Sequence, residues 1–334
     1  MNLRSLVLTA MFAAACAAAT TATPIAHAEP ERVPDTVDIA CAGAIRHRNA
    51  DWYLPDGSAH GLVWLQHGFA RSNANVASLA EHFAAAGYVV FAPALPFLDP
   101  AGCTLQNLGD NTGFLDNIAG LFATAAEPTS PLARSFAAAT AAAHRPDLRL
   151  PQETVFVGHS AGAEAVEYVA HRLHVDHPAA FADLRGLVLL DPVKSFLGDN
   201  TDQALSDLDH TDLPILDVAA KPSQCNLFGI GTAAVQRLLH RRYLGVRIGT
   251  GVHTDAEGAS GDTLGNLLCG NPKSVNISTL QTLAVGWTTD YFTGTRTADY
   301  YPAHAPATDA ATAQSAVTEA VSAAPEAKIL TGSE

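Results

Sequence analysis

One serine of the sequence stands in a pattern that enzymes use to present a nucleophile. Residues 158–162 read Gly-His-Ser-Ala-Gly, which fits G-x-S-x-G with Ser160 at the centre. An apolar run precedes this motif and an amphipathic helical pattern follows it, so the motif occupies a turn between a strand and a helix. Such a turn brings two backbones so close that a Cβ on either side of the serine would clash. The sequence therefore predicts Ser160 as a nucleophile, with a structural Gly-Ser turn as the alternative.

Attack by a serine on a carbonyl also requires N–H groups that stabilise the oxyanion. The N–H of Ala161, directly after the nucleophile, is expected to be one donor. The second is expected in the loop after the apolar run 61–66, where His-Gly-Phe follows. We predict the N–H of Phe69 as this donor, with its ring lining the acyl pocket. An ordinary strand-to-helix turn is the alternative at this position.

The general base is expected late in the chain, on a loop after the last strand. His253 follows the apolar run 245–248 by a short glycine-containing turn. The other late histidines are poorer candidates, because His240 lies in an arginine-rich helical pattern and His304 lies in an Ala/Thr/Ser/Pro-rich tail. We predict His253 as the base, against a solvated loop histidine.

The triad acid is the least determined member of the site. Asp191 ends the apolar run 186–191, at the edge of the sheet where ligands bind. The loop after the next run holds no carboxylate, and Asp217 lies inside that run, where it is expected to point into a helix-packed layer. We predict Asp191 as the acid, with Asp255 or a helix-capping role for Asp191 as alternatives. Asp191 is then expected to orient His253, which takes the proton of Ser160.

The elements that position these residues alternate between strands and helices, which is typical of a mainly parallel sheet covered by helices on both faces. Strands are predicted over residues 61–66, 88–93, 154–158, 186–191, 215–219 and 245–248. Helices are predicted over residues 73–86, 114–125, 132–144, 161–173 and 277–292. No linker divides this region, so residues 29–301 are expected to form one α/β catalytic domain.

Both ends of the chain differ from this domain in composition. Residues 1–28 combine Arg4, an apolar stretch and the sequence Ala-His-Ala, as a secretory signal does. A retained anchor and a lipoprotein box at Cys16 are the alternatives for this segment. Residues 302–334 are rich in Ala, Thr, Ser and Pro, which predicts a disordered tail. The protein is therefore expected to be secreted, with association with the cell envelope left open.

The charge and the cysteines limit the partners. The net charge of −14 and the lack of a basic cluster argue against nucleic acid as a partner. Four cysteines remain after the signal, which suggests two disulfides with three possible pairings. We expect Cys41–Cys103 and Cys225–Cys269. No zinc-type spacing is present, and the predicted chemistry needs neither metal nor organic cofactor. A monomer without a membrane span is expected.

The motifs together resemble the chlorophyllase-like and polyester-hydrolase-like branch of the α/β-hydrolases. The resemblance is carried by His67-Gly68-Phe69, Asn73 at a helix start, the sequence Gly-Tyr-Val-Val-Phe-Ala-Pro at 87–93, the Ser160 turn and Leu-Asp-Pro-Val at 190–193. In chlorophyllase-like enzymes the acid lies in such an Asp-Pro-Val segment, which again implies Asp191. Ala161 departs from both groups, which carry Arg or a bulky residue such as Met there. The resemblance therefore implies the α/β-hydrolase fold but not the substrate.

Three functions are compatible with these residues. The first is an esterase or lipase acting on a small-molecule, lipid or polyester ester. The second is an acyltransferase, which uses the same triad but passes the acyl group to an alcohol. The third is a non-catalytic binding module, which normally loses the serine or histidine that this chain retains. We expect a carboxylic ester hydrolase.

Overall fold

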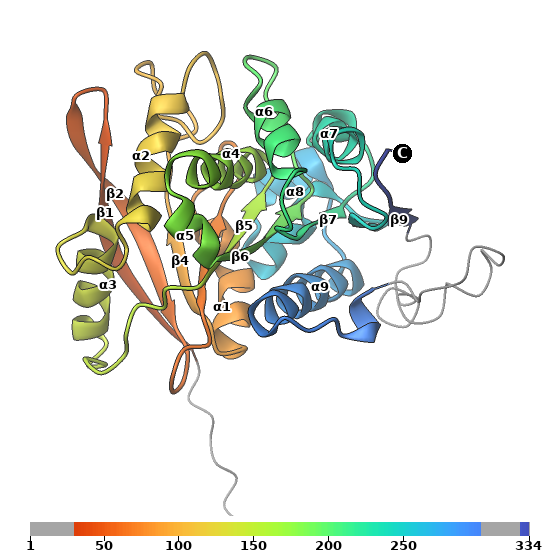
Figure 1. Cartoon of the computed structure of the whole chain (residues 1–334). Coiled ribbons are helices and arrows are strands. Elements are labelled where there is room, and N and C mark those ends of the chain that lie inside the picture. Colours follow the sequence, from red (N-terminus) through yellow and green to blue (C-terminus); the bar gives the residue numbers. More distant parts are fainter. Residues whose placement is uncertain (1–29, 302–327, 334) are drawn as a thin grey trace, which may run out of the picture.

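The computed structural model describes residues 30–301 and 328–333, and its described part is built around one mixed sheet (Figure 1). The nine strands follow the order β1-β2-β4-β3-β5-β6-β7-β8-β9. They are β1 (Glu31–Cys41), β2 (Ala44–Leu54), β3 (Leu62–Gln66), β4 (Val89–Pro93), β5 (Thr154–His159), β6 (Leu184–Leu190), β7 (Ile215–Ala219), β8 (Gly245–Arg247) and β9 (Lys328–Leu330). From β4 to β8 all neighbours are parallel, and β1, β2 and β9 are antiparallel to their neighbours. The carboxyl ends of β3 to β8 therefore meet at one edge.

Helices cover both faces of this sheet. They are α1 (Ala77–Ala85), α2 (Thr112–Ala123), α3 (Pro131–Ala142), α4 (Ala161–Asp176), α5 (Pro178–Asp183), α6 (Asn200–Leu208), α7 (Ile230–Leu238), α8 (Thr263–Cys269) and α9 (Ser274–Thr293). Short 3-10 helices span Asn73–Val76, Leu227–Gly229, His253–Ser260 and Ala298–Tyr300. Helices α2, α3, α4, α6 and α7 contribute to the core on one face, and α1 and α9 to the core on the other.

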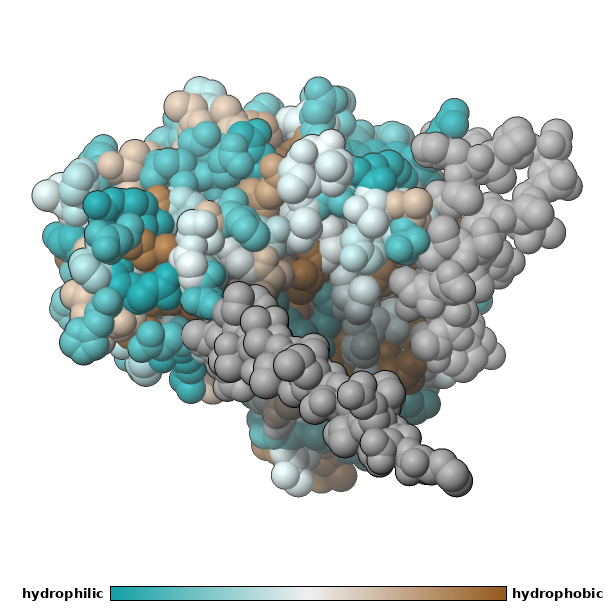
Figure 2. Space-filling view, turned by 90° about the horizontal axis from the view of Figure 1, so that it is seen from below, coloured by the Kyte–Doolittle hydropathy of each residue, from teal (hydrophilic) through white to brown (hydrophobic). Residues whose placement is uncertain are grey.

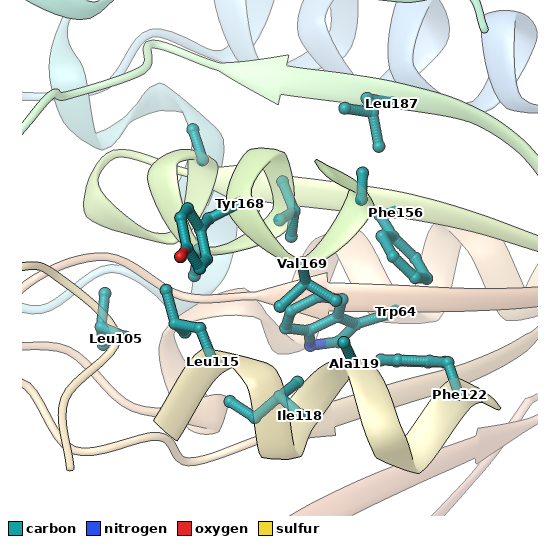
Figure 3. Close-up of a cluster of buried hydrophobic side chains, with 14 of the residues drawn as sticks. Trp64, Leu105, Leu115, Ile118, Ala119, Phe122, Phe156, Tyr168, Val169 and Leu187 are labelled. Carbon is teal, nitrogen blue, oxygen red and sulfur yellow. The ribbon is translucent and has the colours of Figure 1, made fainter. Parts of the chain in front are cut away.

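The two cores follow from the alternation of side chains along the strands. Trp64 of β3 and Phe156 of β5 point to the face that α2 and α4 cover, while their neighbours Val63 and Val155 point to the face of α1 and α9. Figure 3 shows the first of these cores, in which the Trp64 ring lies 4.9 Å from that of Phe156 and 5.2 Å from that of Phe122. Strands buried on both faces are predominantly apolar, which is why their sequences show hydrophobic runs.

The predicted fold class is confirmed, with additions at both edges of the sheet. The strands predicted from the sequence correspond to β3 to β8. The hairpin β1–β2 extends the sheet on one side, and β9 extends it on the other by pairing with β8. The prediction of a disordered tail over residues 302–334 is wrong for its end, because residues 328–330 form a strand and Leu330 is buried. Residues 1–28 and 302–327 lie outside the described residues.

Two disulfides connect distant parts of the described chain. Cys41 at the end of β1 is bonded to Cys103 in the loop after β4. Cys225 in the loop after β7 is bonded to Cys269 at the end of α8. These are the pairs expected from the sequence. Within the described residues, no helix is both long enough and apolar enough to cross a membrane.

Candidate active site

Ser160 occupies the sharp turn between β5 and α4. Its backbone has φ 57° and ψ −125°, a conformation that side-chain-bearing residues rarely adopt. A Cβ on Gly158 would lie 2.4 Å from the carbonyl oxygen of Gly162, and a Cβ on Gly162 would lie 2.5 Å from that of His67. Both glycines are thus required by the close approach of β5, α4 and the end of β3. This packing holds Ser160 in its strained turn.

His253 brings the three predicted triad residues together. It begins the 3-10 helix that follows β8, and its side chain is buried. Its Nε2 lies 2.9 Å from Oγ of Ser160, and its Nδ1 lies 2.6 Å from Oδ2 of Asp191. Three segments far apart in the sequence therefore form one continuous chain of hydrogen-bonding groups. These distances allow a proton to pass from the serine to the imidazole.

Asp191 is held by groups that lie far from it in the sequence. Its Oδ1 accepts a hydrogen bond of 2.9 Å from the N–H of Ala220. The side-chain amide of Asn226 lies 3.1 Å from both carboxylate oxygens and also donates to the carbonyl of Lys221. Asn226 is fully buried. It lies in the loop that holds no carboxylate, and it meets Asp191 across 35 residues of sequence, so no local pattern indicates its role. Asn226 thus fixes the plane of the Asp191 carboxylate.

The alternative acids are placed differently. Asp255 accepts hydrogen bonds from the N–H groups of Val252 and Lys273, at 2.7 and 3.2 Å, and makes no hydrogen bond to His253. Its role is to cap the turn that begins at His253. Burial raises the pKa of the Asp255 carboxyl to about 6. Asp217 is fully buried within β7, and burial raises its pKa well above the ordinary range. The geometry thus joins His253 to Asp191 alone among the candidate acids.

The two predicted oxyanion donors flank the serine. Ala161 is the first residue of α4, so its N–H belongs to the free amino end of that helix. On the other side, a Cβ on Gly68 would lie 2.8 Å from Cβ of Ser160, which places the backbone before Phe69 against the nucleophile. The Phe69 side chain is half-exposed, and its ring lies 5.2 Å from that of Phe97. The ring thus lies at the surface rather than inside the core.

A second histidine, His159, supports the position of His253. Its Nε2 donates a hydrogen bond of 3.0 Å to the carbonyl of His253, and the two rings lie 4.7 Å apart. Burial lowers the pKa of His159 well below its usual value, so its ring stays neutral. A neutral ring that donates from Nε2 adds no positive charge beside His253. The pattern G-x-S-x-G leaves the position of His159 variable, so the sequence gives no signal for this contact.

Glu164 connects two loops at the same edge of the sheet. It lies one turn into α4 and is buried. Its carboxylate accepts hydrogen bonds from the N–H of Asn107, at 2.9 Å, and from the N–H and hydroxyl of Ser195, at 2.6 and 2.5 Å. Burial raises the pKa of Glu164, and these donors lower it in part. The loops after β4 and β6 are thus attached to the helix that carries the nucleophile.

The sheet order and the nucleophile turn together define the class of fold. A mainly parallel sheet with helices on both faces, a serine turn after β5 and the order Ser160, Asp191, His253 are the features of an α/β-hydrolase. The chain has this fold. Among the described residues, no cluster of His, Cys, Asp or Glu is arranged to hold a metal ion.

Several solved structures are similar to this chain. A dienelactone hydrolase from Anabaena variabilis has a TM-score of 0.49 at 16% identity, over 79% of this chain and 99% of its own. A fungal esterase from Rhizomucor miehei has a TM-score of 0.48 at 12% identity, over 80% and 86%. A carboxyl esterase from Bacillus coagulans has a TM-score of 0.31 at 21% identity, over 53% and 49%. No protein-family model matches the sequence, and no curated protein does.

Proposed function

We propose that the chain is a serine hydrolase that cleaves carboxylic esters through an acyl-enzyme intermediate. The observation that carries this proposal is the continuous contact from Oγ of Ser160 through the ring of His253 to the carboxylate of Asp191. Each of these residues is buried and attached to the end of a different strand. A strained serine with a base in hydrogen-bonding contact is the arrangement that activates a hydroxyl.

The proposed reaction has two half-reactions. In the first, His253 takes the proton of Ser160 while the serine oxygen attacks the ester carbonyl, and the N–H groups of Phe69 and Ala161 stabilise the oxyanion. The carbon–oxygen bond to the alcohol then breaks, and His253 returns the proton to the departing alcohol. In the second, water attacks the acyl-enzyme with the same base, which releases the acid and restores Ser160. Asp191 keeps the imidazole in the required tautomer and stabilises its protonated form.

We also propose that the protein is exported. Residues 1–28 have the composition of a secretory signal. Two disulfides support this proposal, because such bonds persist in oxidising compartments. Mass spectrometry of the protein recovered from culture medium tests it, with a chain that begins at residue 29 as the expected result. An intact residue 1 on cell-retained protein would contradict it.

The Ser160→Ala variant tests the proposed activity. The smaller side chain adds no strain to the turn, so the fold should persist while turnover of p-nitrophenyl butyrate falls by about a thousandfold or more. Circular dichroism checks the fold, and Ser58→Ala, at an exposed position, is the matched control. Retention of most activity in Ser160→Ala would refute the role of the serine. Product analysis with and without added alcohol distinguishes hydrolysis from acyl transfer.

A further inference from the structure

Exposed hydrophobic side chains gather at the edge of the sheet that carries Ser160. In the described residues, the large exposed hydrophobic side chains away from this edge are Val175 and Ile329, whereas Ile45 lies beside it at the tip of the β1–β2 hairpin. The others belong to the segments that follow β3, β4, β6, β7 and β8. Single exposed hydrophobic residues are ordinary on a protein surface, whereas a concentration on one side marks a site of interaction.

The loops after β3 and β4 supply the first part. Phe69 follows β3, and its ring packs edge-to-face on Phe97 of the next loop. Leu98 and Leu108 of that loop are 72% and 42% exposed. The loop after β6 adds Phe196 and Leu197, at 75% and 54%. The loops after β4 and β6 project on the same side of the molecule (Figure 1).

The segments after β7 and β8 supply the second part. Leu264, Leu267 and Leu268 of α8 are 64%, 79% and 69% exposed. Their spacing of three and four residues places them on one face of the helix. Phe228, in the loop after β7, is 71% exposed and has φ 60°, a left-handed backbone that is strained for a bulky residue. A strained backbone that exposes an aromatic ring is costly and indicates a role outside the core.

These segments contact one another in a closed circuit, which we call the apolar rim. Arg71, two residues after Phe69, donates hydrogen bonds to Glu257 and to Asp262 at the start of α8. The end of α8 is joined to the Phe228 loop by the Cys225–Cys269 disulfide.

The circuit continues on the other side of the site. Gly231 at the start of α7 lies against the carbonyl of Pro192, which connects the Phe228 loop to the Phe196 loop. Asn107 donates to Asn200 and so connects the Phe196 loop to the loop that carries Phe97. Ser160 lies within this circuit, because Gly68 on one side and Val193 on the other contact it.

The rim is fixed in position. Disulfides attach the loop after β4 to β1 and the Phe228 loop to α8, and Glu164 holds the loops after β4 and β6. The opposite side of the molecule differs from it. In Figure 2, outside the grey residues, that side is mostly hydrophilic or intermediate, and hydrophobic residues form small separate groups. The apolar surface is therefore built to remain exposed around Ser160.

We propose that the apolar rim docks the enzyme onto the surface of a water-insoluble, uncharged ester, so that Ser160 faces the ester phase. The rim is apolar, and the exposed charged side chains of its segments do not form a basic patch, because they are Asp110, Asp199, Asp262, Lys221 and Lys273. With a chain net charge of −14, this composition disfavours an anionic lipid surface. Burial of the rim against an apolar phase removes its side chains from water. The substrate class rests on the proposed function, whereas docking itself does not.

The experiment measures docking without catalysis. Ser160→Ala protein is mixed with emulsified tributyrin and centrifuged, and the protein that floats with the droplets is quantified. The double change Leu264→Ser and Leu267→Ser in this background should lower the bound fraction about tenfold, because two apolar side chains no longer leave water. The double change Val175→Ser and Ile329→Ser, away from the rim, should leave it unchanged. High salt should not weaken docking, because no ion pair is involved.

Activity supplies the second measurement, now with Ser160 present. The Leu264→Ser and Leu267→Ser double variant should hydrolyse soluble p-nitrophenyl butyrate at the unmodified rate and emulsified tributyrin about tenfold more slowly. Absence of activity on both substrates in the unmodified protein would refute the proposed function. Flotation of the Ser160→Ala protein would still test the rim, because it does not require catalysis. Absence of flotation, equal loss in the control pair, or stronger binding to phosphatidylglycerol vesicles would overturn the rim proposal. So would a dimer that the leucine changes dissociate.

Discussion

The hydrogen bonds around Asp191 explain why a carboxylate can act as an orienting group while buried. Oδ1 accepts from Ala220 and Asn226, and Oδ2 accepts from His253 and Asn226. Donors of this kind replace the hydrogen bonds to water that burial removes from a carboxylate. Asp217 lies opposite Leu189 in the neighbouring strand β7 and accepts none of these hydrogen bonds, and burial raises its pKa well above the ordinary value. Of these two buried aspartates, only Asp191 is therefore positioned to orient His253.

Asp191→Asn tests the assignment of the acid. The amide keeps the size of the side chain but favours the wrong imidazole tautomer of His253, so turnover should fall by up to about ten-thousandfold near neutral pH. Asp255→Asn should have a far smaller effect, because Asp255 contacts the backbone of the turn and not the ring. Both variants are compared by steady-state hydrolysis at equal folded concentration. A crippled Asp255→Asn beside a normal Asp191→Asn would show that the acid lies in the histidine loop.

Asp217 predicts a pH dependence of stability. Burial, and then the negative charge of Asp191, raise its pKa well above the ordinary value, so the folded chain binds this proton more tightly than the unfolded chain. The favourable contribution is complete below the unfolded pKa of about 3.9 and is lost as pH rises toward the folded pKa. Asparagine does not titrate, so the Asp217→Asn variant does not lose stability at this position as pH rises. The free energy of unfolding of the variant relative to the unmodified protein should therefore rise with pH above about 4, by up to about 1.4 kcal/mol per pH unit.

Urea unfolding between about pH 5 and pH 8 measures this difference. The exposed Asp56→Asn is the control, and its profile should run parallel to that of the unmodified protein. A parallel profile for Asp217→Asn as well would show that the buried carboxyl does not retain its proton in the folded chain.

At the scale of the elements, the sequence predicted those strands and turns that a local pattern of residues determines. Apolar runs of four to six residues predicted β3 to β8, and the flanking glycines predicted the serine turn between β5 and α4. The edges of the sheet depend on contacts between distant segments. Strand β9 has only Lys-Ile-Leu, too short to show a period, and it becomes a strand because β8 offers a free edge. The same reason applies to Asn226, whose importance appears only when β6 places Asp191 beside it.

Because β9 pairs with β8, we expect substitutions in β9 to change the free energy of unfolding. Leu330 is 2% exposed within a core, whereas its neighbour Ile329 is 42% exposed. Leu330→Ala should lower the free energy of unfolding by about 2–4 kcal/mol through lost burial and a cavity. Ile329→Ala, the matched control one residue away, should cost less than about 1 kcal/mol. Chemical denaturation measures both. Equal, small effects would show that β9 contributes little to the fold.

At the scale of the whole molecule, cross-links and one buried carboxylate fix the loops of the catalytic edge. The Cys41–Cys103 bond attaches the loop after β4 to the outermost strand, β1. The Cys225–Cys269 bond attaches the loop after β7 to α8, next to the position of Asn226. The first bond reaches the helix after Ser160 only through the Asn107–Glu164 contact, whereas the second lies one residue from Asn226, which holds the acid. Stability and activity should respond differently to the loss of each.

Removal of each disulfide tests this difference. The bonds join residues 62 and 44 positions apart, so the paired Cys→Ser changes should each cost up to about 4 kcal/mol of unfolding free energy in the chain-entropy model. Only the loss of Cys225–Cys269 should also lower kcat for a soluble ester, because Asn226 then loses the constraint that keeps its amide on Asp191. Thermal unfolding and kinetics on folded protein separate the two effects. An unchanged kcat in Cys225→Ser/Cys269→Ser would contradict this prediction, because the bond would then act on stability alone. An equal fall of kcat in Cys41→Ser/Cys103→Ser would also contradict it, because the effect would then not depend on Asn226.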